Sequence, residues 1–128
     1  MERFARRWAG RLEAGQSVAL AGGLGAGKTT FVRALVRVLH GSDEAVSSPT
    51  FVFRQRYDGV PVVEHIDLYR LDDPAELAAL GLEDAFAADR LTLVEWPERA
   101  AGLLPAPDLT FDFEGAGDAP RHVRVRTA

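Results

Sequence analysis

The sequence contains no cysteine, and only one of its 15 Lys and Arg residues is a lysine. Without cysteine the chain has no disulfide scaffold and no metal site built on thiolates, which is typical of a cytoplasmic protein. It also lacks a run of the roughly 20 apolar residues that a membrane helix needs, and the apolar stretch of a secretory signal. We therefore expect a cytoplasmic protein that makes no membrane contact.

Basic residues also do not outnumber acidic ones in this sequence. The formal net charge is −4 at pH 7, so the chain as a whole does not attract nucleic acid. Any nucleic-acid role would need a local patch or a partner protein that makes the contact.

The chain has enough apolar residues for one core, since 47% of its 128 residues are hydrophobic. The expected elements of its first part are an amphipathic helix over Glu2–Glu13, a buried strand over Ser17–Ala21 and a helix over Lys28–His40. Phe4, Trp8 and Leu12 are spaced by four in the first helix, and Gly41 suits the end of the second.

Strands and helices continue to alternate in the second part. Residues 50–57 and 60–67 are expected to form a hairpin around Asp58-Gly59, and a helix should begin at Asp73-Pro74 and end at Gly81. A turn or helix over 83–88 and a strand over Leu91–Glu95 should follow. Residues 109–113 and 123–125 are expected to form a terminal hairpin. The class is therefore α/β, with residues 1–128 as a single domain.

A glycine-rich loop joins the first strand to the second helix. Residues 22–29 (GGLGAGKT) match the phosphate-binding pattern G-x4-G-K-[ST]. Glycines let consecutive N–H groups face one phosphate, a lysine ammonium reaches the β- and γ-phosphates, and the threonine hydroxyl coordinates Mg²⁺. The pattern predicts phosphate binding by Gly25, Ala26, Gly27, Lys28, Thr29 and Thr30, with Mg²⁺ at Thr29; a chance match in a glycine-rich turn is the alternative.

The single lysine also bears on which nucleotide is bound. A Ras-type guanine pocket uses an N-K-x-D motif, which needs a second lysine, so that pocket is excluded. Adenine nucleotide, and therefore ATP, is the default. Trp96 either stacks on the adenine or belongs to the core, and the sequence leaves both open.

Carboxylates follow two apolar strands, at the edge of the sheet where ligands of α/β proteins bind. Glu95 and Asp67 are candidates to hold Mg²⁺ or assist hydrolysis, and the alternative is that both are solvated strand ends. Ser48 and Thr50 lie where a loop that senses the γ-phosphate could sit, or in an ordinary turn. His65 is read as structural, because an isolated histidine usually is.

Four stretches together resemble one family. GGLGAGKTTF (22–31), SPTF (48–51), HIDLYRL (65–71) and EWPE (95–98) have the order and spacing of the TsaE family, bacterial P-loop ATPases of tRNA threonylcarbamoyladenosine biosynthesis. The resemblance covers residues from about 14 to 107. Two departures stand out: Gly23 replaces the aspartate that the family usually has, and the strand that usually precedes the first helix is missing.

The resemblance implies a three-layer, P-loop NTPase-like fold with a mixed sheet. It implies an ATPase that supports, but does not perform, the transfer of a threonylcarbamoyl group to the tRNA adenosine next to the anticodon. TsaD makes that transfer, TsaB is a second partner, and tRNA is contacted indirectly. The implied roles are phosphate binding for Lys28, Mg²⁺ binding for Thr29 and Glu95, hydrolysis or the metal shell for Asp67, a switch-like loop at Ser48 and Thr50, and the nucleotide pocket for Trp96.

Two other functions use the same loop. A small-molecule kinase needs a basic lid over the phosphates, and Pro74–Asp89 contains no arginine or lysine. A protein that binds ATP only as a conformational ligand would show no meaningful turnover.

Overall fold

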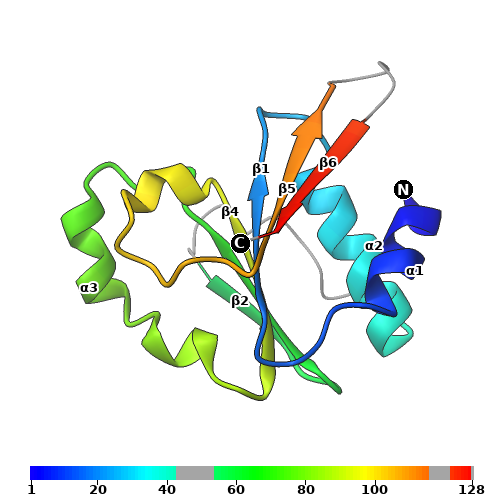
Figure 1. Cartoon of the computed structure of the whole chain (residues 1–128). Helices are drawn as coiled ribbons and strands as arrows, with labels where there is room; N and C mark the ends of the chain where they lie inside the picture. Colours follow the sequence, from blue (N-terminus) through cyan, green and yellow to red (C-terminus); the bar gives the residue numbers. More distant parts are fainter. Residues whose placement is uncertain (43–53, 116–121, 128) are drawn as a thin grey trace.

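The computed structural model describes residues 1–42, 54–115 and 122–127, and within these ranges six strands form one sheet. Figure 1 shows this sheet between the helices. The strands are β1 (Ser17–Ala21), β2 (Arg54–Tyr57), β3 (Val62–Asp67), β4 (Arg90–Glu95), β5 (Leu109–Glu114) and β6 (His122–Thr127). Their order is β2-β3-β4-β1-β5-β6. The four inner strands are parallel, and each edge strand is antiparallel to its neighbour. The sheet is therefore mixed, as predicted.

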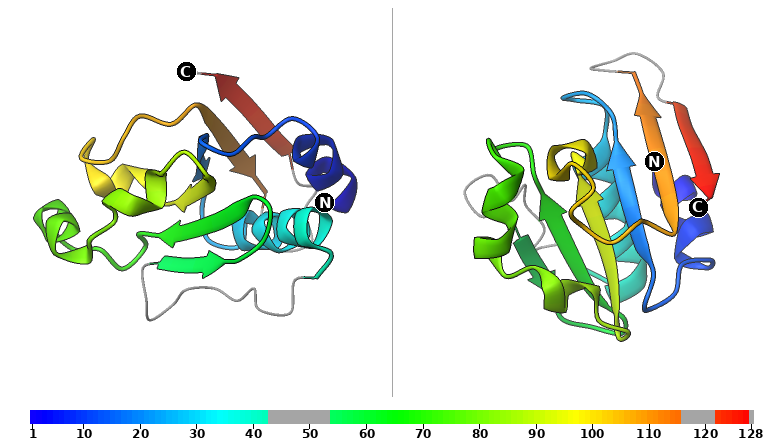
Figure 2. Two further views of the ribbon diagram at one scale, coloured as in Figure 1. Left: turned by 90° about the horizontal axis from the view of Figure 1, so that it is seen from below. Right: turned by 60° about the vertical axis from the view of Figure 1, so that its left-hand side comes forward.

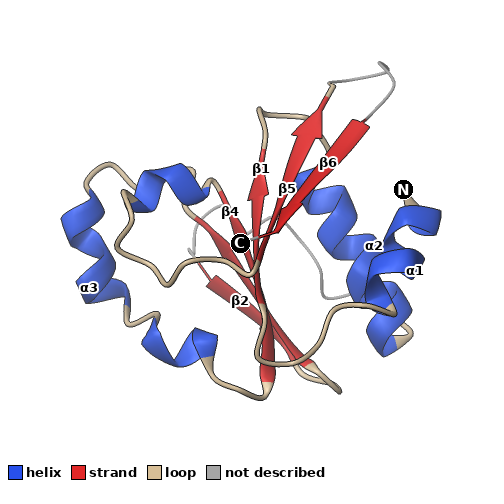
Figure 3. Ribbon diagram, in the orientation of Figure 1, coloured by secondary structure: helices blue, strands red, loops and turns tan. Residues whose placement is uncertain are grey.

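Helices cover both faces of this sheet (Figures 1–3). One face carries α1 (Glu2–Ala9) and α2 (Lys28–His40); the other carries α3 (Leu77–Leu80) and three short 3₁₀ helices, η1 (Pro74–Glu76), η2 (Glu83–Phe86) and η3 (Pro97–Ala100). The arrangement is the predicted three-layer α/β fold. Within the described ranges, no helix combines the length and the apolar character that crossing a membrane requires.

Each face of the sheet has its own core. Aromatic rings dominate the α1–α2 side, where Phe31 and Phe111 are fully buried with ring centroids 5.4 Å apart. The α3 side is aliphatic; Ile66 and Val94 of the sheet pack there with Leu77 and other buried side chains. Burial of large apolar side chains at roughly 1.5–3 kcal/mol each holds both layers to the sheet.

The predicted elements are present, with shifted ends. α1 stops at Ala9, before the expected Glu13, because Gly10 is a poor helix residue; Leu12 still reaches the core at 7% exposure. Asp73 caps η1 by accepting a hydrogen bond from the Ala75 N–H, as its position before Pro74 predicted. The β2–β3 and β5–β6 pairs confirm both hairpins over their described residues.

Candidate functional site

The loop between β1 and α2 turns through glycines with positive φ. Gly22, Gly25 and Gly27 have φ of 143°, 74° and 106°. At Gly22 an added Cβ would lie 2.7 Å from the carbonyl oxygen of Phe113, so the β5 backbone leaves room for glycine alone. The predicted strand, glycine loop and helix are confirmed, and the loop ends at the positive pole of a 13-residue helix.

Lys28 is the first residue of α2, and its side chain folds back over this loop. Its Nζ donates a hydrogen bond to the Gly22 carbonyl at 2.5 Å and lies 3.6 Å from the centre of the Trp96 ring. Only 5% of the residue is exposed. Burial lowers the pKa of Lys28, while the nearby Glu95 carboxylate acts against that shift. A buried ammonium on a flexible stem, partnered by a carbonyl and an aromatic face, suits the binding of an anion.

The carboxyl ends of β3 and β4 place two acids beside the loop. Their register pairs Asp67 with Glu95. Glu95 is 3% exposed, and its Oε2 accepts a hydrogen bond from the Thr29 hydroxyl at 3.1 Å. Burial raises the pKa of Asp67, and repulsion from Glu95 adds to that shift, although the Tyr69 N–H donates to Asp67 Oδ1 at 2.9 Å. A hydroxyl and two carboxylates therefore converge next to Lys28.

These oxygens are of the kind that Mg²⁺ prefers. Among the described residues, no group of three or more His, Cys, Asp or Glu side chains could hold a metal ion by itself. The pair formed by Thr29 and Glu95 suits a Mg²⁺ ion that takes its other ligands from phosphate oxygens and water.

His65 also reaches Glu95, which the sequence did not predict. Its Nε2 lies 2.5 Å from Glu95 Oε2, where the ring N–H donates to the carboxylate. The histidine is fully buried, and its Nδ1 has no hydrogen-bond partner in the part of the chain that the structure describes. The available signal was its alternation with Asp67 on β3, read together with an acidic end on the neighbouring strand.

Trp96 leaves the sheet directly after Glu95, in a left-handed backbone conformation with φ of 57°. Such a φ is uncommon for a bulky residue, and it turns the chain sharply. The ring lies 5.0 Å from the Tyr69 ring, and the Arg99 guanidinium is 5.8 Å from its centre. This conformation brings the indole face under the Lys28 ammonium.

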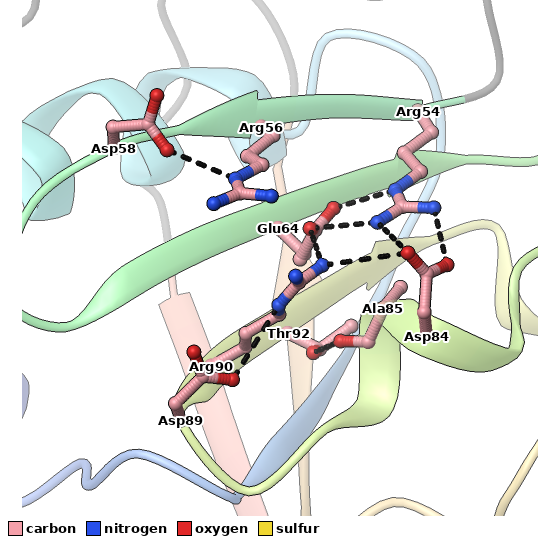
Figure 4. A network of polar contacts seen from close by, with 9 residues as sticks. All are labelled: Arg54, Arg56, Asp58, Glu64, Asp84, Ala85, Asp89, Arg90 and Thr92. Carbon is pink, nitrogen blue, oxygen red and sulfur yellow. Dashed lines mark hydrogen bonds and ion pairs between the residues drawn. The ribbon is translucent and has the colours of Figure 1, made fainter.

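A second charged cluster lies on the α3 side of the sheet and is drawn in Figure 4. Arg54 donates two hydrogen bonds to the fully buried Glu64, at 2.7 and 2.8 Å, and two to Asp84, at 2.8 and 3.3 Å. Arg90 Nη1 donates at 2.7 Å to Glu64 Oε1, which also accepts one of the hydrogen bonds from Arg54. We call Arg54, Glu64, Asp84 and Arg90 the arginine cluster, and its ion pairs tie β2, β3, β4 and η2 together. Arg90 Nε has no hydrogen-bond partner among the described residues.

A family model described as threonylcarbamoyl adenosine biosynthesis protein TsaE matches residues 1–123. The chain belongs to the TsaE family. Among the relatives of this chain, the TsaE protein of Rickettsia bellii is 41% identical over 119 residues, which cover 92% of this chain and 82% of the relative. That of Haemophilus influenzae is 40% identical over 103 residues, covering 80% of this chain and 65% of the relative, just under two thirds. The names of these relatives refer to tRNA threonylcarbamoyladenosine biosynthesis.

A solved structure supports the fold assignment. The crystal structure of Bacillus subtilis YdiB superimposes with a TM-score of 0.72 at 31% identity, covering 95% of this chain and 74% of that chain. The resemblance to the TsaE family and the predicted α/β class are therefore confirmed.

The structure brings most of the predicted site residues of this TsaE-family chain to one place. The acids Asp67 and Glu95 and the ring of Trp96 gather beside the β1–α2 loop, which contains Gly25, Ala26 and Gly27, and beside the first turn of α2, which contains Lys28, Thr29 and Thr30. Ser48 and Thr50 lie outside the described residues. At Gly23, where the family usually has aspartate, an added Cβ would meet nothing within 4 Å, so sterics do not require glycine.

Proposed function

We propose that the protein binds ATP with Mg²⁺ at the β1–α2 loop and hydrolyses it in support of tRNA threonylcarbamoyladenosine biosynthesis. The observation that carries the proposal is the Lys28 ammonium, buried above a glycine loop and beside the Thr29–Glu95 pair. Family membership supplies the pathway. The absence of a second lysine favours ATP over a nucleotide read by an N-K-x-D motif.

The loop and helix α2 would bind the phosphates. Backbone N–H groups from Gly25 to Thr30 would donate hydrogen bonds to phosphate oxygens, and the helix dipole favours their negative charge. Lys28 would give up its contact with the Gly22 carbonyl to bind the phosphates. This exchange costs little, because a buried ammonium gains a fully charged partner in place of a neutral one.

Thr29 and Glu95 would hold Mg²⁺, which neutralises charge on the phosphates when it is bound. His65 fixes the Glu95 carboxylate through its Nε2. Asp67 assists hydrolysis or hydrogen-bonds water of the metal shell. Trp96 forms a wall of the nucleotide pocket, and Ser48 and Thr50 belong to a switch-like loop that responds to the γ-phosphate.

The partners in this proposal are TsaD and TsaB, and the site of action is the cytoplasm. TsaD carries out the transfer to tRNA, so this chain contacts tRNA through the complex. Its net charge of −4 supports that division, because the chain as a whole has no electrostatic attraction for RNA.

The test combines phosphate release and reconstituted tRNA modification with TsaD and TsaB. We expect Lys28→Ala to lower ATP turnover about 100-fold or more and to abolish multiple-turnover modification. Arg3→Ala, an exposed change on α1, is the matched control and should behave as wild type.

Two outcomes would contradict the proposal in different ways. If wild type released no more phosphate than Lys28→Ala, with or without partners, ATP would be only a conformational ligand. If TsaD and TsaB modified tRNA over many turnovers equally well without this protein, the pathway role would be wrong.

A further inference from the structure

An apolar groove lies on the α3 side of the sheet. It has a volume of about 780 Å³ and runs between the segment from η1 to η2 and the loop that follows η3. Its apolar lining includes Leu77, Leu82, Phe86, Leu103, Leu104 and Pro105. The right-hand view of Figure 2 turns this side of the molecule forward. We call this feature the α3 groove.

Part of the groove wall is open to solvent. Leu103 is 63% exposed, while Leu77 and Leu82 form a buried floor at 7% and 4% exposure. An exposed apolar side chain that continues a hydrophobic groove gains free energy when another chain covers it. The groove therefore has the form of a docking site for apolar side chains.

The segment that forms one wall of the groove is acidic. The segment from Asp72 to Asp89 contains six carboxylates and no lysine or arginine. Asp84 and Asp89 lie near arginines, but Glu76 on η1 and Glu83 on η2 are exposed, and Glu83 lines the groove itself. A ligand with positive charges flanking its apolar residues would complement this rim.

We propose that the α3 groove docks a basic, amphipathic segment of a different protein, with its apolar side chains on Leu103 and its cationic ones near Glu76 and Glu83. This is the geometry in which an amphipathic helix lies in a hydrophobic groove. Nucleic acid and anionic lipid fit less well, because both are negatively charged and the carboxylates at the groove would repel them.

A second copy of this chain is also a poor occupant. Its basic helix α1 exposes Arg3, Arg6 and Arg7, which would suit the acidic rim. However, the large apolar residues of that helix, Phe4 and Trp8, pack into the copy's own aromatic core. The helix would therefore offer charge without an apolar face.

The groove is separate from the nucleotide site, since none of Lys28, Thr29 and Glu95 lines it. The proposal extends beyond the proposed ATPase function and does not depend on it. Groove variants should retain ATP turnover, and Lys28→Ala should retain docking.

The test uses a fluorescent Leu/Lys amphipathic peptide of about 18 residues, and the same peptide with Glu in place of Lys. Fluorescence anisotropy should show binding of the basic peptide at least about tenfold tighter than binding of the acidic one. The double variant Glu76→Lys/Glu83→Lys should weaken the basic peptide about tenfold or more. The control Glu13→Lys/Asp58→Lys makes the same change in net charge at exposed sites elsewhere and should have a much smaller effect.

A second pair of variants tests the apolar contact. Leu103→Asp should weaken the basic peptide about tenfold, whereas Val60→Asp, at a site 92% exposed, should leave its affinity nearly unchanged. All these sites are on the surface, and urea unfolding verifies that each variant is folded. The proposal is overturned if both charge variants weaken binding equally, if the two peptides bind alike, or if Leu103→Asp has no effect. Dimerisation of the wild type that Leu103→Asp abolishes would instead assign the groove to a second copy and overturn it too.

Discussion

Two buried groups of charge lie on opposite faces of the same strand, and they are built differently. The arginine cluster surrounds Glu64 with two guanidiniums, so its buried carboxylate is satisfied on both oxygens. The next residue, His65, points to the other face and contacts Glu95 near Lys28. There the ammonium meets a carbonyl and a ring in place of a carboxylate. Each group has one buried nitrogen without a hydrogen-bond partner among the described residues, Arg90 Nε in the arginine cluster and His65 Nδ1 here.

This difference shows in the protonation equilibria. In the arginine cluster, hydrogen bonds to Glu64 raise the pKa of Arg54, and those from Arg54 lower the pKa of Asp84, so the folded state favours the charged forms. Around Lys28, burial lowers the pKa of Lys28 and raises the pKa of Asp67, so folding disfavours their charged forms. The fold therefore stabilises the charges of the first group and disfavours the charges of Lys28 and Asp67 in the second.

The largest effect is expected on removing the centre of the arginine cluster. Glu64→Gln keeps the shape of the side chain but leaves Arg54 and Arg90 without their shared carboxylate. Breaking a buried ion pair in this way costs about 3–5 kcal/mol, which urea unfolding followed by circular dichroism would measure. Asp58→Asn is the control, because Asp58 is 82% exposed in its pair with Arg56 and should change stability little. A loss for Glu64→Gln as small as for the control would show that the cluster is not a structural tie.

A smaller effect is expected on the opposite face, and on function instead of stability. If His65 fixes the Glu95 carboxylate, His65→Ala should raise the Mg²⁺ concentration for half-maximal ATP hydrolysis about 10–100-fold. His65→Gln, which keeps an N–H donor, should restore part of this loss. The control is His40→Ala, since His40 contacts the Pro61 carbonyl away from the site. An unchanged Mg²⁺ requirement in His65→Ala, with lower turnover only, would remove the positioning role.

The sequence predicted one of these two clusters and missed the other. The loop residues and the acids Asp67 and Glu95 follow local rules, because a glycine motif and the ends of parallel strands mark a ligand edge before any fold is known. The arginine cluster depends on register: Arg54 lies opposite Ile66, and Glu64 lies opposite Thr92 of β4. The β3–β4 register brings Arg90 to Glu64, 26 positions away, and the position of η2 brings Asp84 to Arg54, 30 positions away. No local pattern encodes either contact.

The contacts of His65 and Trp96 could be predicted only in part from the sequence. Alternation on β3 placed His65 on the face of Asp67, but only the packed sheet shows that its Nε2 reaches Glu95. The position of Trp96 after a strand was visible, whereas its left-handed backbone is a tertiary feature that places the ring under Lys28. Local patterns thus identified side chains that could gather at this edge of the sheet. Only the packed structure shows which of them are in contact.

The smallest effect expected is a difference in pH dependence between one carboxylate of each group. The pKa of Asp67 is raised in the folded state. The stability that protonation of Asp67 contributes is therefore present at low pH, and it is lost as the pH rises above the ordinary value of 3.8 and through the folded pKa. Replacing it in Asp67→Asn should therefore increase stability relative to wild type at neutral pH. The pKa of Asp84 is lowered, so its contribution is present above 3.8 and lost as pH falls through the folded pKa. Asp84→Asn should accordingly be less stable than wild type at neutral pH and approach it in acid. Urea midpoints from about pH 3 to about pH 7 would measure both trends. Trends of the same sign for the two variants would contradict the division between a cluster whose charges the fold stabilises and one whose charges it disfavours.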